Sequence, residues 1–414
     1  MTSGKIQSAI QLRQEKELPL INLSFADFTF YDSLLTRKKI RKAFANVFRY
    51  PYYYPTAKGE SEALDAVCDY YKRQKREVDP GSLILTASVN QACLYLLRLF
   101  SSDGGEVLVP KPFSPAMDEV AAFLGQELKT YSLQSDNGWQ IDLEDLAKKI
   151  TTQTRAIFLM SPHLPTGAIQ SEETLRKLLK LLKDKKIALI MDESLSDFVF
   201  NKTQFPVLAQ LSANRQLVVT LQTLSNAFAL PGLKLSWMQV SGPKTAAAEL
   251  ISRLEMLADT FLNLNQLSQT ILPEVVRYSR RWRHRFQKVV EKNRDILVGK
   301  LSKAPRLQFH YPEGGFYALI EVLPPETQPA VTKTTESDAV IAPTSPESAS
   351  PAPLEFTNSE DFSVQLLEKT GVYVHPGTYY GLQTGCYFMT CFLQNPSTLR
   401  KSLKKIVKFL KPPK

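Results

Sequence analysis

The sequence predicts an α/β protein whose main sheet is largely parallel. Between residues 83 and 240, short apolar runs alternate with segments of helical spacing. That order is typical of parallel strands joined by crossover helices. At 414 residues the chain is long enough for a large core and for more than one domain. The expected strands are 83–86, 106–110, 154–160, 187–191 and 217–221, and the expected helices include 63–75, 172–185 and most of 247–300.

Composition and charge exclude several classes of protein. No run of eighteen apolar residues and no apolar N-terminal stretch is present, so we expect neither a membrane span nor a signal peptide. The four cysteines have no paired or metal-ligand spacing, which indicates free thiols, a cytoplasmic protein and no metal site. The net charge is +10, and basic residues concentrate in 277–285 and 400–411. Both stretches have helical apolar spacing, so we interpret them as solvated helix faces and expect no nucleic-acid partner.

The segment 218–237 carries the most informative motif. An apolar strand is followed by a short polar loop, Thr223-Leu224-Ser225-Asn226, and then by a Pro231-Gly232 turn that leads to Lys234. The pattern resembles the S-x-S-K-x-x-x-x-P-G-x-R-x-G stretch of class I/II aminotransferases, fold-type I enzymes that depend on pyridoxal phosphate (PLP). In that family the lysine forms a Schiff base with the cofactor, and the arginine binds its phosphate. Here these positions hold Asn226, whose amide is not nucleophilic, and Lys234.

The resemblance implies a set of cofactor-binding residues. Tyr54, in a Y-x-P-x-x-G-like segment, would reach the phosphate held by a neighbouring subunit, although packing of 52–54 against a dimer surface is an equal alternative. Ser88 and Val89 open a helix whose free N–H groups would bind the phosphate, where the family usually has glycine. Phe113 stands where an aromatic side chain stacks on the pyridine ring, or it is a core phenylalanine. Thr223, Ser225 and Lys234 would complete the phosphate site.

Contacts to the ring itself are only partly kept. Asp192, in Asp-Glu-Ser-Leu, resembles the family's D-E-x-Y, whose aspartate pairs with the pyridinium nitrogen. A turn cap is the alternative, but the neighbouring motifs favour the cofactor position. The tyrosine that binds the cofactor's phenolic oxygen is replaced by Leu195. The asparagine that binds the same oxygen is replaced by Leu164, and His163 lies beside it.

The C-terminal part resembles the family's smaller domain. Its strand 387–392 has Met389 where the family's arginine binds the substrate carboxylate. Residues 324–353 are rich in Pro, Ser, Thr, Ala and Glu, so we predict a disordered insertion. The resemblance implies a fold-type I PLP-transferase architecture. In it 1–45 joins the small domain, 46–300 form a large domain with a mainly parallel seven-stranded sheet, and 301–414 form a small α+β domain.

These replacements argue against ordinary transamination, which needs a lysine amine, an electron-withdrawing ring and an arginine for the carboxylate. The two catalytic positions have lost their functional side chains: Asn226 replaces the lysine and Met389 replaces the arginine. We therefore expect a homodimeric pseudoenzyme that binds PLP, or another phosphate-bearing ligand, non-covalently at best. One alternative is an unusual enzyme that uses PLP or its amine form without a lysine tether, with His163 as the base. The weakest is a conventional aminotransferase that uses another lysine, Lys234 being the nearest candidate.

The insertion gives a first testable prediction. A disordered segment offers its backbone to proteases, whereas a folded domain does not. Limited proteolysis, followed by mass spectrometry of the fragments, should therefore show the first cuts within 324–353 while both flanking parts stay intact. First cuts elsewhere, or a resistant chain, would show that the segment is ordered.

Overall fold

The computed structural model describes residues 4–31, 38–47, 55–200, 205–261, 264–324 and 356–411. Tyr54 and, apart from Pro324, the predicted insertion 324–353 lie outside these ranges, so both remain predictions. Within the described ranges, no helix is long and apolar enough to cross a membrane. The same ranges contain no group of three or more His, Cys, Asp or Glu side chains that could hold a metal ion.

The larger part of the molecule is built on one eight-stranded sheet, with strand order β2-β9-β8-β7-β6-β3-β4-β5. Six strands run parallel, and only β9 and β5 run antiparallel to their neighbours. The expectation of seven strands was wrong, because the sheet has an eighth strand, β5. This strand has only two residues and is too short to give an apolar pattern in the sequence. The strands are β2 (Leu83–Thr86), β3 (Glu106–Lys111), β4 (Lys129–Gln134), β5 (Gln140–Ile141), β6 (Thr154–Met160), β7 (Ala188–Asp192), β8 (Val218–Thr223) and β9 (Ser236–Ser241).

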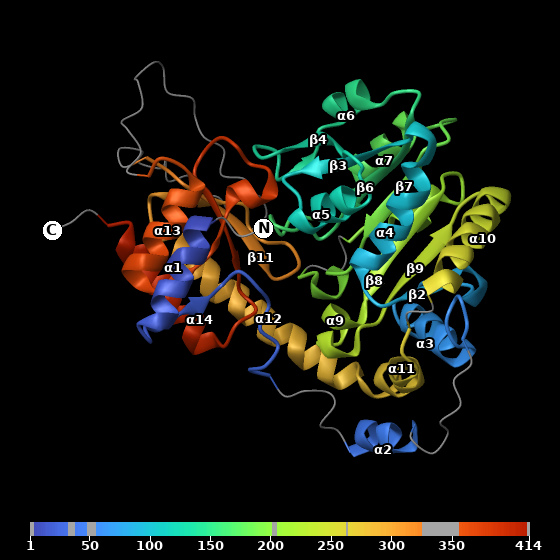
Figure 1. Cartoon of the computed structure of the whole chain (residues 1–414), viewed down its shortest axis with the longest axis horizontal. Coiled ribbons are helices and arrows are strands. Elements are labelled where there is room, and N and C mark those ends of the chain that lie inside the picture. The colour runs from blue at the N-terminus through green and yellow to red at the C-terminus, as the bar shows by residue number, and fades with distance from the viewer. Residues whose placement is uncertain are drawn as a thin grey trace.

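Helices cover both faces of this sheet, which explains its continuous apolar strands. Alternate side chains of a strand point to opposite faces. In β6, Ala156 and Phe158 join the core on one face, and Ile157 and Leu159 join the cluster on the other. Figure 1 shows the helices around the sheet. The first face is covered by α3 (Ser61–Lys72), α4 (Val89–Phe100) and α10 (Lys244–Phe261), and the second by α6 (Leu143–Lys149), α7 (Glu172–Leu181) and α8 (Leu208–Ser212).

The smaller part has an antiparallel sheet of order β10-β11-β14-β13. The long helix α12 is tied to it by Asn293, whose buried side chain donates to the carbonyls of Phe392 at 2.9 Å and Gln394 at 2.7 Å. The N-terminal strand β1 (Ile21–Asn22) pairs with β12 (Val372–Tyr373). The strands are β10 (Leu307–Phe309), β11 (Tyr317–Val322), β13 (His375–Pro376) and β14 (Tyr387–Cys391), and the helices are α1 (Gly4–Glu15), α12 (Arg280–Leu301), α13 (Ser359–Thr370) and α14 (Pro396–Phe409).

Four further helices complete the described α-helices. α2 (Lys38–Val47) and α3 both pack on α11 (Gln266–Tyr278), and α5 (Pro115–Phe123) packs on α4. One local expectation was wrong: residues 224–227 form a short helix, α9 (Leu224–Ala227), rather than a loop. Thr223 begins this helix, because its hydroxyl accepts the Ser225 N–H. Polar residues that favour a helix cap also favour turns, so the sequence alone did not separate the two.

Candidate functional site

The candidate site lies at the edge of the large sheet where the parallel strands end. Strands β2, β8, β7, β6 and β3 all present their carboxyl ends to this edge. Such an edge, where strand order and direction place several loops together, is the usual ligand position in α/β folds. The structure therefore brings together most of the residues expected from the sequence, namely Ser88, Val89, Phe113, Asp192, Thr223, Ser225 and Asn226.

Asp192 ends β7 and is 7% exposed. Its carboxylate accepts the Ser194 N–H at 2.8 Å, but it forms no ion pair within the described part of the chain. Burial raises the pKa of Asp192 to about 6, because a desolvated carboxylate is less stable when charged. The group therefore is mostly ionised at pH 7 and lacks a cationic partner. A protonated ring nitrogen would supply one.

The start of α4 offers amide donors. The Ser88 hydroxyl accepts the Gln91 N–H at 3.1 Å, and the Gln91 side chain accepts the Ala87 N–H at 2.7 Å. The first helical amides, those of Val89 and Asn90, have no hydrogen-bond partner among the described residues. They point from a helix N-terminus, where the dipole favours an anion. Ser88 thus acts as the helix cap, and the main chain beside it carries the free donors.

The segment after β8 is more internally bonded than the sequence implies. The Thr223 hydroxyl oxygen accepts from the Ser225 N–H at 3.2 Å and from the Ser236 hydroxyl at 2.9 Å. Ser225 and Asn226 are half-buried on α9. Lys234 is exposed and has a φ of +47°. Ser225 and Lys234 therefore remain candidate phosphate ligands, whereas the Thr223 hydroxyl is already engaged.

Apart from Asp192, the side chains expected around the cofactor ring are apolar. Phe113 is 4% exposed and packs edge-on against Phe158 at 5.1 Å between ring centroids. Its ring lies 25° from the plane of His163 at 6.4 Å. Leu195 is buried against the positive-φ residue Gly315, where an added Cβ would lie 3.0 Å from Leu195 Cδ1. Leu164 is partly buried against the core. Neither leucine can donate a hydrogen bond.

His163 has a different environment from that of an accessible base. It is 1% exposed, and its Nδ1 lies 2.9 Å from the Thr166 hydroxyl. Burial lowers the pKa of His163 to about 3, so the imidazole is neutral at physiological pH. Proton transfer from a substrate would require this side chain to leave its packed position.

Met389 lies on β14 of the smaller sheet. It is 1% exposed and its Cα pairs in register with Leu319 and His375. It belongs to the apolar cluster that also contains Leu319 and Tyr380. The position thus serves packing and offers no charge to a carboxylate.

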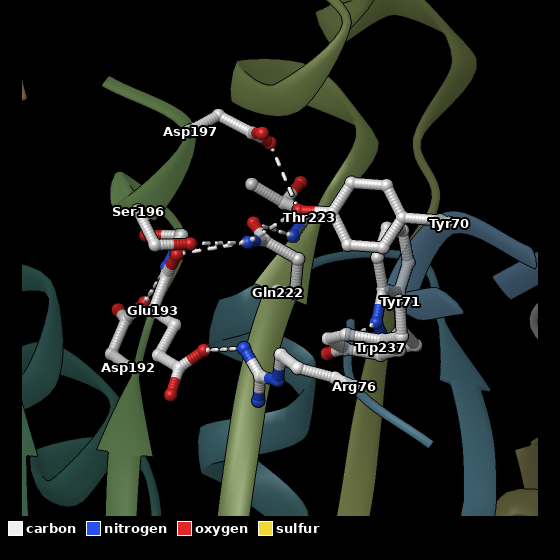
Figure 2. A network of polar contacts seen from close by, with 11 residues as sticks. Tyr70, Tyr71, Arg76, Asp192, Glu193, Ser196, Asp197, Gln222, Thr223 and Trp237 are labelled. Atoms are coloured by element: carbon white, nitrogen blue, oxygen red, sulfur yellow. Dashed lines mark hydrogen bonds and ion pairs between the residues drawn. The ribbon is translucent and has the colours of Figure 1, made fainter. Parts of the chain in front are cut away.

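A buried polar network beneath the site was missed by sequence reasoning (Figure 2). The Arg76 guanidinium, at the end of α3, forms an ion pair with Glu193 at 2.5 Å, and the two side chains are 6% and 1% exposed. The Gln222 amide donates to the Glu193 carbonyl at 2.9 Å. The Tyr70 hydroxyl donates to Asp197 at 2.9 Å. The sequence signal that could have indicated this network is proximity to the predicted site residues, because Glu193 follows Asp192 and Gln222 precedes Thr223.

The residues present fit one end of PLP better than the other. Asp192 suits a pyridinium nitrogen, and the α4 amides with Ser225 and Lys234 suit a phosphate. Leu164 and Leu195 leave the phenolic oxygen without a donor, and Asn226 supplies no amine for a covalent link. Among the described residues, the strand ends thus offer a partner for a ring nitrogen and donors for a phosphate, and the position of the family's lysine holds Asn226.

Comparison with known proteins identifies the relatives of this chain. The family model "Aminotransferase class I and II" matches residues 19–406. A probable aspartate/prephenate aminotransferase of Aquifex aeolicus is 29% identical over 270 residues, which cover 64% of this chain and 67% of that protein. Tyrosine aminotransferase of Bos taurus is 25% identical over 308 residues, which cover 73% and 68%.

Solved structures agree with the fold. The alanine aminotransferase of Pyrococcus furiosus superposes with a TM-score of 0.82 at 22% identity, covering 98% of this chain and 95% of that one. The aspartate aminotransferase of Thermotoga maritima gives 0.80 at 17% identity, covering 99% and 97%. The predicted fold class, a large domain with a mainly parallel sheet and a small α+β domain, is confirmed.

The environment of Asp192 predicts a pH-dependent stability change. A raised folded-state pKa destabilises the native state above that pKa, and this penalty fades as the pH falls toward the unfolded-state value. Asp192→Asn should therefore raise the free energy of unfolding by about 1–3 kcal/mol at pH 7, with a smaller gain at pH 4.5. Urea unfolding at the two pH values measures the difference. The matched control is Asp118→Asn, a half-exposed carboxylate paired with Lys111, which should change stability little. A destabilised Asp192→Asn protein at pH 7 would contradict this account.

Proposed function

The chain belongs to the aminotransferase class I and II family, and from that premise we propose that it is a degenerate member which binds PLP non-covalently and does not catalyse ordinary transamination. The single observation that carries the proposal is Asn226 on α9, at the position of the family's lysine. An amide nitrogen is neither basic nor nucleophilic, so it can neither hold the cofactor covalently nor move a proton. Members of the family use PLP, which supplies the electron-withdrawing ring when bound.

The retained groups support binding. Asp192 would hold the ring nitrogen, and its uncompensated charge favours a cationic partner. The amides of Val89 and Asn90, the Ser225 hydroxyl and the Lys234 amine would hold the phosphate. Each charge-assisted hydrogen bond contributes roughly 1.5–3 kcal/mol. These contacts are enough for reversible binding of a ligand that has both a ring and a phosphate.

The replaced groups oppose tight binding and turnover. A buried phenolic oxygen facing Leu164 and Leu195 would lose its hydrogen bonds to water without replacement, which costs roughly 1–3 kcal/mol. Met389 offers no charge for a substrate carboxylate. Transamination therefore lacks both the side chains that bind the cofactor's phenolic oxygen and the side chain that orients the substrate carboxylate.

The two alternatives have weaker support. A tether-free enzyme would need His163 as its base, but that imidazole is 1% exposed and its pKa is about 3. A conventional enzyme would need Lys234 as its nucleophile. Lys234 is exposed and follows the 3-10 turn 231–233, at the family's phosphate-binding position. Neither residue replaces the lost lysine in its role.

Restoring the amine tests the proposal. Asn226→Lys should gain the visible absorbance of a covalently linked cofactor when PLP is added, and borohydride should fix the cofactor to that lysine in a tryptic peptide. The wild-type protein should show PLP in its free-aldehyde form and give no borohydride-fixed peptide. Asn226→Gln is the matched control, because it changes the side-chain length without adding an amine.

Three outcomes would contradict this account. A borohydride-fixed lysine in the wild-type protein would mean that another lysine serves as the tether. Transaminase activity of the wild-type protein on common amino acids would mean that the vacant positions are filled by other groups. Failure of Asn226→Lys to bind PLP at millimolar concentration would show that the ring position is closed.

We further propose that the protein is a homodimer, as expected from the resemblance. Several large apolar side chains on the described surface support this, with exposures of 40–70%: Phe25, Met256, Phe261 and Leu267. Large exposed apolar groups are typical of interaction surfaces. Light scattering at micromolar concentration should give twice the 46.7 kDa chain mass. A monomer mass there would rule out a stable dimer.

A further inference from the structure

A second concave site lies outside the strand-end site, where the chain after α3 meets the first turns of α12. It is a groove of about 1130 Å³. Its lining includes residues of 73–76, of 196–199 and of the first turns of α12. A volume of this size is typical of small-molecule sites. Neither the family resemblance nor the proposed function makes use of it.

The groove is strongly cationic. Among its described lining residues, one side chain is acidic, Asp197. That carboxylate is already paired with Arg283 and accepts the Tyr70 hydroxyl. The basic side chains are seven arginines and one histidine: Arg73, Arg76, Arg277, Arg280, Arg281, Arg283, His284 and Arg285.

Most of this positive charge is uncompensated within the described chain. Arg76 is neutralised by Glu193 and Arg283 by Asp197. The other five arginines form no ion pair with any described residue, and all five are exposed. Like charges held along one groove repel one another, and an anion between them relieves that repulsion. The interpretation of 277–285 as a simple solvated helix face therefore does not account for the concave shape.

Arg283 adds a separate indication of a ligand. One end of its guanidinium contacts Asp197, but its Nε–H is buried and has no hydrogen-bond partner among the described residues. A buried donor without a partner destabilises the protein. An anion seated in the groove would offset the positive charge of this guanidinium.

The chemistry favours phosphate groups. A guanidinium is permanently charged, and its fork of donors matches two phosphate oxygens at once. Several arginines within one groove suit a ligand with several phosphates better than a single anion. A single-stranded nucleic acid would need aromatic platforms for its bases, and the described lining contains one aromatic hydrocarbon ring, that of Phe205. We propose that this groove binds a small ligand that carries two or more linked phosphate groups.

Isothermal titration calorimetry with inorganic tripolyphosphate tests this. We expect saturable binding at least tenfold tighter than that of orthophosphate, and weaker binding as salt is raised from 50 to 200 mM. ATP distinguishes the two sources of the ligand chemistry. Equal affinity for ATP and tripolyphosphate indicates recognition of the phosphate chain alone, and tighter binding of ATP indicates a nucleotide.

Paired variants assign the binding to the groove. Arg280→Gln with Arg281→Gln should weaken tripolyphosphate binding at least tenfold, with an unchanged thermal midpoint. Lys292→Gln with Lys300→Gln removes the same charge from exposed positions further along α12 and should weaken it less than threefold.

Several results would overturn the proposal. These are the absence of tripolyphosphate binding in the wild-type protein and an equal loss in the two double variants. Tenfold tighter binding of a twelve-nucleotide single strand than of tripolyphosphate would also overturn it, because the groove would then be part of a nucleic-acid surface.

Discussion

The buried ion pair between Arg76 and Glu193 fixes the floor of the strand-end site. Glu193 is held at three points: its N–H donates to the Leu221 carbonyl at 2.9 Å, its carbonyl accepts from Gln222, and its carboxylate faces Arg76. The end of α3 is thereby joined to the ends of β7 and β8. Removing one partner of such a pair leaves an uncompensated buried charge, which typically destabilises a protein by about 3–5 kcal/mol. The position of Asp192, one residue earlier, depends on this anchor.

Two adjacent carboxylates therefore have opposite surroundings. Glu193 has a guanidinium within contact distance, whereas Asp192 has hydrogen bonds from Ser194 and no cation among the described residues. Burial of Glu193 is balanced by a neighbouring charge. Burial of Asp192 is not, and the pKa of Asp192 rises to about 6. The network below the site absorbs one negative charge and leaves the other for whatever occupies the strand edge. The same network reaches the arginine groove through Asp197 and Arg283.

Sequence reasoning recovered the fold and the gathered residues because both depend on local signals. Apolar runs such as 154–160 predicted strands, and parallel order then placed Ser88, Asp192 and Asn226 at one edge. It missed pairs that are remote in sequence, since no spacing rule connects Arg76 to Glu193 or Arg283 to Asp197. It also did not foresee that the Thr223 hydroxyl would bond to Ser236. That contact exists only because β8 and β9 pair in register.

The two ends of the ring position have opposite energetics, and this decides what ligand the site can hold. At pH 7 the charge on Asp192 opposes folding by about 1–3 kcal/mol, because burial raises its pKa. A ligand whose ring nitrogen carries a proton would convert that penalty into binding free energy. At the other end, Leu164 and Leu195 disfavour a ring oxygen by a similar amount. Loss of the lysine removes only covalent capture and proton transfer. If this edge holds the ligand proposed above, a phosphorylated pyridinium ring without a phenolic oxygen would suit it better than PLP would.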